Sequence, residues 1–200
     1  MRISKLHVVA VLMLGLVLGL AGCSKLPVET VTAMQTALDG AKAAGAETYA
    51  RDALNQAMET KAQADAEIET QNGKFALMRS YKKATEMLTL ATQQFEQANQ
   101  AAVAGKERAR VAANAAVEAA TAALAATNEF LAKAPRGKNT KAELEAMQQE
   151  LVVLQGALGE AVAGVAAEDY INAKAKADVV TQKAAEIQAD IQNAMDKAKR

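Results

Sequence analysis

The stretch that decides the fold is LMRSYKKATEMLTLATQQFEQANQAAVAGKERARVAANAAVEAATAALAATNEF, residues 77–130. Apolar or small residues recur along it at alternating spacings of four and three: Leu77, Tyr81, Ala84, Leu88, Ala91, Phe95, Ala98, Ala102, Gly105, Ala109, Ala112, Ala116, Ala119, Ala123, Ala126 and Phe130. A sustained seven-residue repeat is typical of a coiled-coil seam with a left-handed supercoil. The stretch therefore predicts one long helix over about 75–133. We expect any bend at Gly105, because glycine weakens a helix by about 1 kcal/mol relative to alanine.

Two shorter helices are predicted before the long one. A helix over 29–44 is indicated by the spacing of Val31, Met34, Leu38 and Ala41, and Gly45 should end it because glycine readily adopts the left-handed conformation. The next helix is expected over 46–70, with an inner face of Ala50, Leu54, Ala57, Ala64 and Ile68. The dipeptide Asn72-Gly73 predicts the turn that follows it.

Two more helices are predicted after the strongest turn signal, Ala134-Pro135-Arg136-Gly137-Lys138-Asn139. Thr140 and Glu143 have the spacing of a capping box. The fourth helix carries apolar residues at Leu144, Met147, Leu151, Leu154, Leu158, Ala161 and Val165. A turn over 164–168 should separate it from the fifth helix, which starts at about Asp169 and carries Tyr170, Ala173, Ala177, Val180, Ala184, Ile187, Ile191, Ala194 and Ala198.

Composition supports an almost wholly helical chain. Alanine, the best helix former, supplies 47 of the 178 residues from position 23 onward, and proline occurs only at Pro27 and Pro135. We therefore predict an all-α fold, an elongated antiparallel helical bundle or coiled coil of about five helices that share one long central helix. Residues 29–104 should form an N-terminal helical bundle, and residues 105–200 a C-terminal bundle continuous with the long helix.

Residues 1–22 have the form of a secretory leader, with Arg2 and Lys5 before an apolar run over 6–20. The leader ends on Leu20-Ala21-Gly22-Cys23, which resembles the lipobox of bacterial lipoproteins. This resemblance implies cleavage before Cys23, attachment of acyl chains such as palmitate to Cys23, and a short tether over 23–28. Ser24, where an aspartate would favour inner-membrane retention, implies the outer membrane, facing the periplasm.

The alternative for the leader is a retained transmembrane helix, which needs about 20 apolar residues. The apolar run here is shorter, and no basic stop-transfer cluster follows it. The sequence therefore favours the lipoprotein leader.

A second resemblance rests on Ala44-Gly45-Ala46-Glu47-Thr48-Tyr49-Ala50, an A-G-A-x-x-Y-A motif. It resembles alanine-rich helical bacterial lipoproteins of a family whose function is unknown, in which this motif joins two helices; the similarity extends over about 33–102. Some members of that family carry a following peptidoglycan-binding domain similar to the outer-membrane protein A type. We expect none here, so wall binding through it is not implied.

Charge and residue types exclude several function classes. Without the leader, the chain has 21 basic and 23 acidic residues, and this slightly negative net charge argues against nucleic-acid binding. His7, the only histidine, lies in the leader, and Cys23 is the only cysteine. Disulfides, His/Cys metal sites and His- or Cys-based catalysis are therefore excluded from the mature chain. We expect no catalytic, metal or cofactor site, and no enzyme.

Two groups of residues are candidate binding sites. Basic residues gather at the mid-chain turn (Lys133, Arg136, Lys138 and Lys141), with no acid nearby before Glu143; they could contact an anionic partner or form a solvated loop. The tail Lys197, Lys199 and Arg200 allows the same two interpretations. Aromatic and methionine residues (Tyr49, Tyr81, Tyr170, Phe75, Phe95, Phe130, Met78 and Met87) could line a ligand pocket, but core packing is favoured because most lie on or beside the seams.

The sequence thus predicts a non-catalytic outer-membrane lipoprotein, attached to the membrane through Cys23, that acts as a helical scaffold, spacer or adaptor in the cell envelope. Its partner would be an envelope protein or peptidoglycan, and self-association through the alanine seam stays open. The alternative function is a periplasmic carrier that binds a lipid or another apolar ligand between its helices.

Overall fold

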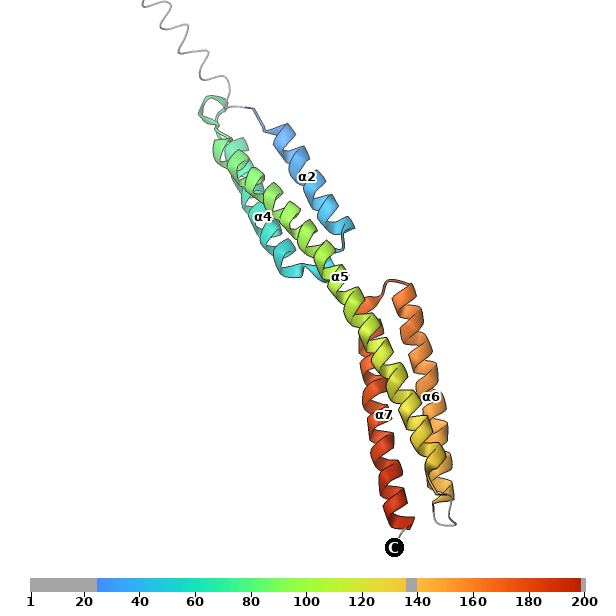
Figure 1. Ribbon diagram of the computed structural model, residues 1–200. Coiled ribbons are helices and arrows are strands. Elements are labelled where there is room, and N and C mark those ends of the chain that lie inside the picture. The colour runs from blue at the N-terminus through green and yellow to red at the C-terminus, as the bar shows by residue number, and fades with distance from the viewer. Residues whose placement is uncertain (1–24, 136–139, 199–200) are drawn as a thin grey trace, which may run out of the picture. The chain divides into compact units, whose positions relative to one another are not determined.

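The chain is described here from a computed structural model, which defines residues 25–135 and 140–198 (Figure 1). All regular structure in these ranges is helical: α2 (Val28–Ala43), α3 (Ala46–Tyr49), α4 (Arg51–Asn72), the 3-10 turn η1 (Ala76–Met78), α5 (Lys82–Lys133), α6 (Lys141–Ala166) and α7 (Tyr170–Ala198). The chain divides into two compact units, unit 1 up to Gly105 and unit 2 from Lys106. The predicted all-α bundle with one long central helix, α5, is confirmed.

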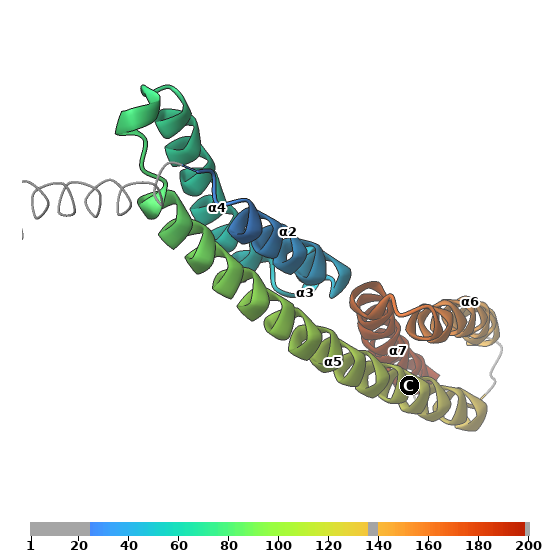
Figure 2. The ribbon, with the colours of Figure 1, turned by 90° about the horizontal axis from the view of Figure 1, so that it is seen from above.

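Unit 1 packs α2 and α4 against the first part of α5, and the three helices lie side by side in Figures 1 and 2. Its core combines large side chains with alanines that let the helices approach closely: Met34, Leu38, Ala41, Ala46, Leu54, Ala57, Ala64, Leu88, Ala91, Phe95, Ala98 and Ala102. The predicted seam from Tyr81 to Gly105 is buried at every position. A polar bond joins α5 to α2, because Asn99 Nδ2 donates to the carbonyl oxygen of Gly40 at 2.7 Å.

The turn after α2 follows the sequence prediction. Gly45 adopts the left-handed conformation with a φ of 82°, and its N–H donates to the carbonyl oxygen of Lys42. This backbone conformation favours glycine because a side chain would meet the following carbonyl oxygen. Gly45 therefore ends α2 one residue after its C-cap, Ala44.

The second predicted helix, over 46–70, is wrong as a single helix. Ala50 has a φ of −147° and a ψ of 41°, so the chain leaves the helical conformation between α3 and α4. At this break the carbonyl oxygen of Tyr49 faces Gly105 of α5 so closely that a Cβ at position 105 would lie 2.5 Å from it. The break thus coincides with a close approach of backbones that the local sequence does not signal.

The predicted start of the long helix, near Phe75, is also wrong. Residues 76–78 form the short turn η1, Arg79 is extended, and α5 begins only at Lys82. Leu77, the first predicted seam position, is 91% exposed. The buried seven-residue spacing therefore begins at Tyr81, and Leu77 belongs to the loop between α4 and α5.

Unit 2 packs α6 and α7 against the rest of α5. The predicted inner faces of both helices are confirmed: every named position of α6 is buried or half-buried, and those of α7 from Tyr170 to Ala194 are buried. The side chain of Ala198 lies outside the described residues. The core centres on Leu124, Leu131, Leu151, Ile187 and Ile191.

The predicted seam in the second half of α5 needs a correction. The buried positions beyond Gly105 are Ala113, Ala116, Ala120, Leu124, Thr127, Leu131 and Ala134. Eight residues separate Gly105 from Ala113, with Ala109 half-buried between them, and two steps of four follow one another again from Ala116 to Leu124. Ala119 and Ala126 of the predicted seam are exposed, and Phe130 is half-buried. A straight helix drifts by about 20° per heptad against a strict repeat, and extra steps of four compensate for that drift. The unbroken heptad prediction is therefore wrong after Gly105.

A polar contact crosses the unit 2 core at one of these unpredicted positions. Thr127 is fully buried, and its Oγ1 lies 2.7 Å from the carbonyl oxygen of Ala123 and 3.3 Å from that of Ala184. The same oxygen accepts a bond from Gln188 Nε2 at 2.9 Å. Thr127 thus links α5 to α7 with its hydroxyl group satisfied, as a buried polar group requires.

The start of α6 differs from the predicted capping box. Thr140 makes no side-chain cap bond; its Oγ1 instead donates to the carbonyl oxygen of Pro135 at 3.2 Å. Glu143 lies 3.7 Å from Lys197 Nζ of α7 rather than folding back to position 140. The capping box is therefore replaced by a bond within the turn and an ion pair between helices.

The turn after α6 closes through two backbone bonds typical of a Schellman motif. The N–H of Asp169 donates to the carbonyl oxygen of Gly164, and that of Glu168 to Val165. Glu168 holds the position where glycine is usual and has a φ of 61°. Its carboxylate forms an exposed ion pair with Lys106 at 2.6 Å.

We expect Glu168→Gly to be more stable than Glu168→Ala by about 1 kcal/mol, because both lose the ion pair but only glycine relieves the left-handed strain. Urea denaturation followed by circular dichroism measures the difference. Equal stabilities of the two variants would show that position 168 is not strained.

Candidate functional site

The lipid attachment site predicted at Cys23 lies outside the described residues, as do Arg136 and Lys138 of the basic turn. The described chain begins at Lys25, two residues after Cys23. Cys23 lipidation and the partner contact at the basic turn therefore stay predictions.

The two described members of the basic turn, Lys133 and Lys141, are exposed at the end of α5 and the start of α6. Each has an acid one helical turn away in its own helix: Lys133 Nζ lies 3.7 Å from Glu129, and Lys141 Nζ lies 3.9 Å from Glu145. The expectation that no acid lies near the turn before Glu143 is therefore wrong at Lys133, because Glu129 precedes it by one helical turn. Exposed pairs of this kind are worth little in stability, so both ammonium groups stay accessible.

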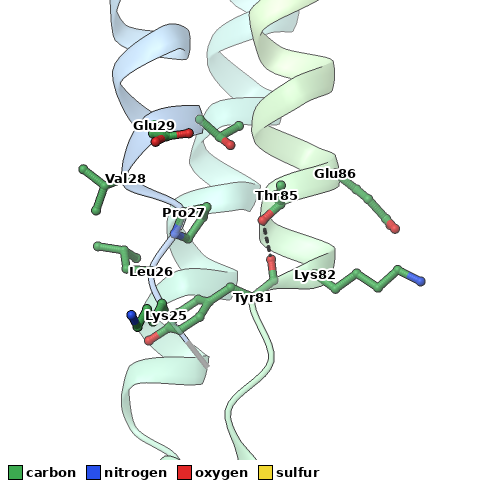
Figure 3. Close-up of a pocket in the computed structure, with 10 residues that line it drawn as sticks. Lys25, Leu26, Pro27, Val28, Glu29, Tyr81, Lys82, Thr85 and Glu86 are labelled. Atoms are coloured by element: carbon green, nitrogen blue, oxygen red, sulfur yellow. Dashed lines mark hydrogen bonds between the residues drawn. The ribbon is translucent and has the colours of Figure 1, made fainter. Parts of the chain in front are cut away.

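A cavity of about 550 Å³ lies at the end of unit 1 where the described chain begins. Its walls come from the segment before α2, from the first turn of α2 and from the start of α5: Lys25, Leu26, Pro27, Val28, Glu29, Thr30, Tyr81, Lys82, Thr85 and Glu86. In Figure 3 the ring of Tyr81 reaches from the start of α5 to the side of Lys25, while Lys82 and Glu86 point away from the tether. The cavity therefore places the predicted tether against the first turn of α5.

The loop that leads into Tyr81 is held by polar bonds to the end of α4. The Arg79 guanidinium donates to the carbonyl oxygens of Asn72 and Lys74, both at 3.0 Å. The Tyr81 hydroxyl donates to Asn72 Oδ1. The backbone N–H of Ser80 donates to Gln71 Oε1 at 3.1 Å, and Gln71 is buried. Four bonds thus fix both ends of the loop to the bundle.

The middle of this loop is apolar and faces solvent. We call residues 75–78 (Phe75, Ala76, Leu77 and Met78) the apolar loop; Phe75 is 75% exposed, Leu77 91% and Met78 76%. Large exposed apolar patches on a folded domain mark surfaces that contact something else. The seven-residue spacing did not predict this surface, because it placed Leu77 on the buried seam. The signal that could have indicated it is the run of four apolar residues that follows Asn72-Gly73-Lys74.

Positive charge flanks the apolar loop. Lys74 precedes it and Arg79, Lys82 and Lys83 follow, while no acidic residue occurs between positions 70 and 85. The nearest acid contact is Glu67 of α4, whose carboxylate lies 3.1 Å from Lys83 Nζ. Bonds from the Gln71 amide and then from Lys83 lower the pKa of Glu67 from its ordinary value, so this carboxylate stays ionised. The loop therefore stands in a local excess of positive charge.

The aromatic and methionine residues divide between the core and this loop. Tyr81, Phe95 and Tyr170 are buried, and Tyr49, Met87 and Phe130 are half-buried against the cores. Phe75 and Met78 are exposed, so core packing does not account for them. The favoured interpretation, core packing, thus fits six of the eight residues.

The residues that the structure describes contain no group of three or more His, Cys, Asp or Glu side chains that could hold a metal ion. None of the helices within 25–135 and 140–198 combines the length and apolar composition that crossing a bilayer requires. Comparisons with protein-family models, with curated proteins and with solved structures find no match for this chain.

Proposed function

We propose that this protein is a non-catalytic lipoprotein of the outer membrane, facing the periplasm, that serves as a helical scaffold, spacer or adaptor in the cell envelope. The observation that carries the proposal is the secretory leader that ends on Leu20-Ala21-Gly22-Cys23. The motif over Ala44–Ala50 also supports it through the resemblance to alanine-rich lipoproteins. In this chain that motif contains the left-handed Gly45, the fully buried Ala46 and the break at Ala50.

The described side chains agree with a structural role. Buried polar groups such as Thr127 and Gln71 are engaged in bonds that join helices and loops. Charged residues form exposed pairs on the outer faces, for example Lys176 with Glu160 and Lys174 with Asp178. The outer helix faces and the basic turn are therefore the surfaces that the proposal offers to a partner.

The anchoring half is tested by Cys23→Ser in the full chain, expressed in a Gram-negative host and grown with labelled palmitate. We expect the unsubstituted protein to carry the label and to separate with outer membranes on a density gradient. The variant should carry no label and leave that fraction, because the thiol is the proposed acylation site and stable anchoring takes two or more acyl chains.

Ser24→Ala and Ser24→Asp are the matched controls for the anchoring test. Both keep Cys23, so both should carry the label, and the aspartate variant should move to the inner-membrane fraction. A Cys23→Ser protein that still incorporates palmitate, or that still separates with outer membranes, would refute the proposed anchor.

The adaptor half is tested by photo-crosslinking from the outer faces in living cells. A crosslinker at Lys133 or Lys141 samples the basic turn, and one at the buried Ala120 is the matched control. We expect a discrete envelope protein or a peptidoglycan fragment from the turn and nothing from position 120. Crosslinks to a second copy alone would replace the adaptor with self-association, and an absence of crosslinks from both lysines would refute a partner at this turn.

The carrier alternative predicts a lipid between the helices. Seam positions of unit 1 are instead occupied by large side chains such as Leu88 and Phe95, and the cavity beside Tyr81 lies at the end of the bundle. Native mass spectrometry of the purified protein separates the two functions, because a carrier retains a ligand of defined mass and a scaffold does not.

A further inference from the structure

We propose that the apolar loop, residues 75–78, inserts into the surface of a bilayer with anionic headgroups and forms a second membrane contact beside the acyl chains. The proposal rests on the proposed function, because the anchor is what brings unit 1 to a membrane. It assigns a task to Phe75, Leu77 and Met78, whose exposure core packing does not explain.

The first argument is the chemistry of the loop. Phe75, Leu77 and Met78 are each at least three-quarters exposed. All three lie in or next to the short turn η1, within residues 70–85, which contain no acid. Phenylalanine and leucine are typical of the apolar faces that enter the boundary between headgroups and acyl chains. Each such side chain strengthens partition into an apolar phase by roughly tenfold or more.

The second argument is that the loop is held in place. Arg79 bonds to Asn72 and Lys74, and Tyr81 bonds to Asn72, so the loop is closed at its base. A loop fixed before binding loses little conformational entropy when it binds. These polar bonds thus present the apolar side chains in an arrangement suited to insertion.

The third argument is charge complementarity. Lys74, Arg79 and Lys82 flank the apolar side chains, and Lys83 beside them pairs with Glu67. A basic residue near an anionic membrane surface strengthens binding by roughly fivefold. A neutral apolar partner would not be attracted by these basic residues. The combination of apolar tip and basic flank therefore fits a lipid surface with anionic headgroups.

The fourth argument is position. Lys25, two residues after Cys23 in sequence, lines the same cavity as Tyr81 and Lys82, which lie three and four residues after Met78, the last residue of the loop. Acyl chains on the tether and the apolar loop would therefore reach one membrane from the same end of unit 1. Continuity with the tether argues for the membrane itself as the occupant rather than a second copy of the chain.

The test uses the absence of tryptophan from the sequence. Leu77→Trp gives the full chain a single tryptophan in the apolar loop, and Val153→Trp places one at a comparably exposed apolar position on α6. Each protein is purified from membranes in detergent and reconstituted into phosphatidylethanolamine/phosphatidylglycerol vesicles with or without brominated acyl chains. We expect brominated lipid to quench the tryptophan at position 77, with blue-shifted emission, and to leave the one at position 153 unquenched.

A third protein combines Leu77→Trp with Phe75→Ser and Met78→Ser. If the loop inserts because it is apolar, its partition into lipid should weaken by roughly a hundredfold, since two apolar side chains are lost, and the quenching should fall with it. Quenching that persists would mean that the tether alone brings position 77 to the lipid, and it would overturn the proposal. Equal, water-like emission at positions 77 and 153 would overturn it as well, and circular dichroism checks that all variants are folded.

The mass of the N-terminal peptide from the same preparations separates the loop from the anchor. If the protein is acylated but the tryptophan at position 77 is not quenched, the proposed lipid anchor stands and the proposed insertion of the apolar loop is refuted. If the protein carries no acyl chains but its tryptophan is quenched, insertion of the apolar loop stands and the proposed anchor at Cys23 is refuted. Replacing phosphatidylglycerol with a zwitterionic lipid should weaken the quenching, and no change would refute the part played by the basic flank.

Discussion

Replacing Phe95 with alanine should destabilise unit 1 by about 3–5 kcal/mol, the usual cost of removing a fully buried phenylalanine. Phe95 has no exposed surface and belongs to the unit 1 core, in which seven of the twelve buried residues are alanines. Alanine side chains cannot rotate into the space that the ring leaves, so the cavity should persist and the cost should lie toward the upper end. A domain of this size has about 5–15 kcal/mol of stability in total, so the loss is a large fraction of it.

Hydrogen exchange and thermal denaturation together measure this effect, because the chain has two units and a single transition cannot be assumed. We expect the melting transition of unit 1 to fall by more than about 10 °C. Peptides from 28–72 should lose protection while those from 141–166 keep theirs. Phe75→Ala is the matched control: it removes the same side chain from an exposed site and should change stability by about 0.5 kcal/mol or less. Equal losses for both substitutions would contradict the burial of Phe95.

The second large effect is expected at Gly105. A methyl group there would lie 2.5 Å from the carbonyl oxygen of Tyr49 and 3.0 Å from its Cβ, so the backbone of α3 would have to move. Overpacking of this kind costs about 1–3 kcal/mol, which exceeds the gain of up to about 1 kcal/mol from alanine in a helix. We therefore expect Gly105→Ala to destabilise unit 1, and Gly105→Val to do so further.

Gly156→Ala in α6 is the control for this prediction, because no atom lies within 4 Å of the added methyl group. Here only the helix preference acts, and we expect a gain of up to about 1 kcal/mol. Urea denaturation of both variants measures the change in the free energy of unfolding, which should be a loss for Gly105→Ala and a gain for Gly156→Ala. If Gly105→Ala were as stabilising as Gly156→Ala, the close approach of Tyr49 to α5 would be wrong.

Several features of the fold follow from local sequence. Gly45 predicts its own turn because only its missing side chain makes a φ of 82° easy to adopt. The α6 and α7 faces were predictable because Leu151, Ile187 and Ile191 are large apolar residues at helical spacing with exposed neighbours. The seam from Tyr81 to Gly105 was predictable for the same reason, since Leu88 and Phe95 identify the buried side.

Tertiary structure decided what alanine leaves undetermined. Between Gly105 and Ala134 alanine lies on several sides of α5, so a period of seven fits more than one face equally well. The partners α6 and α7 selected the face with Leu124 and Leu131, because burying these larger side chains removes more apolar area from water than burying Ala119 or Ala126. The break at Ala50 likewise lies next to a backbone contact between Tyr49 and Gly105, which are 56 residues apart in sequence.

By itself, the sequence determined that the chain is helical and where most of its helices end. It also carries the leader and lipobox on which the prediction for Cys23 rests. Those features depend on residues close together along the chain, through backbone preference and helical spacing. The tertiary structure decided which face of α5 is buried in unit 2 and that Phe75, Leu77 and Met78 face solvent. These outcomes depend on where the bundle ends and which partners cover α5, because an apolar side chain is buried only where another element packs against it.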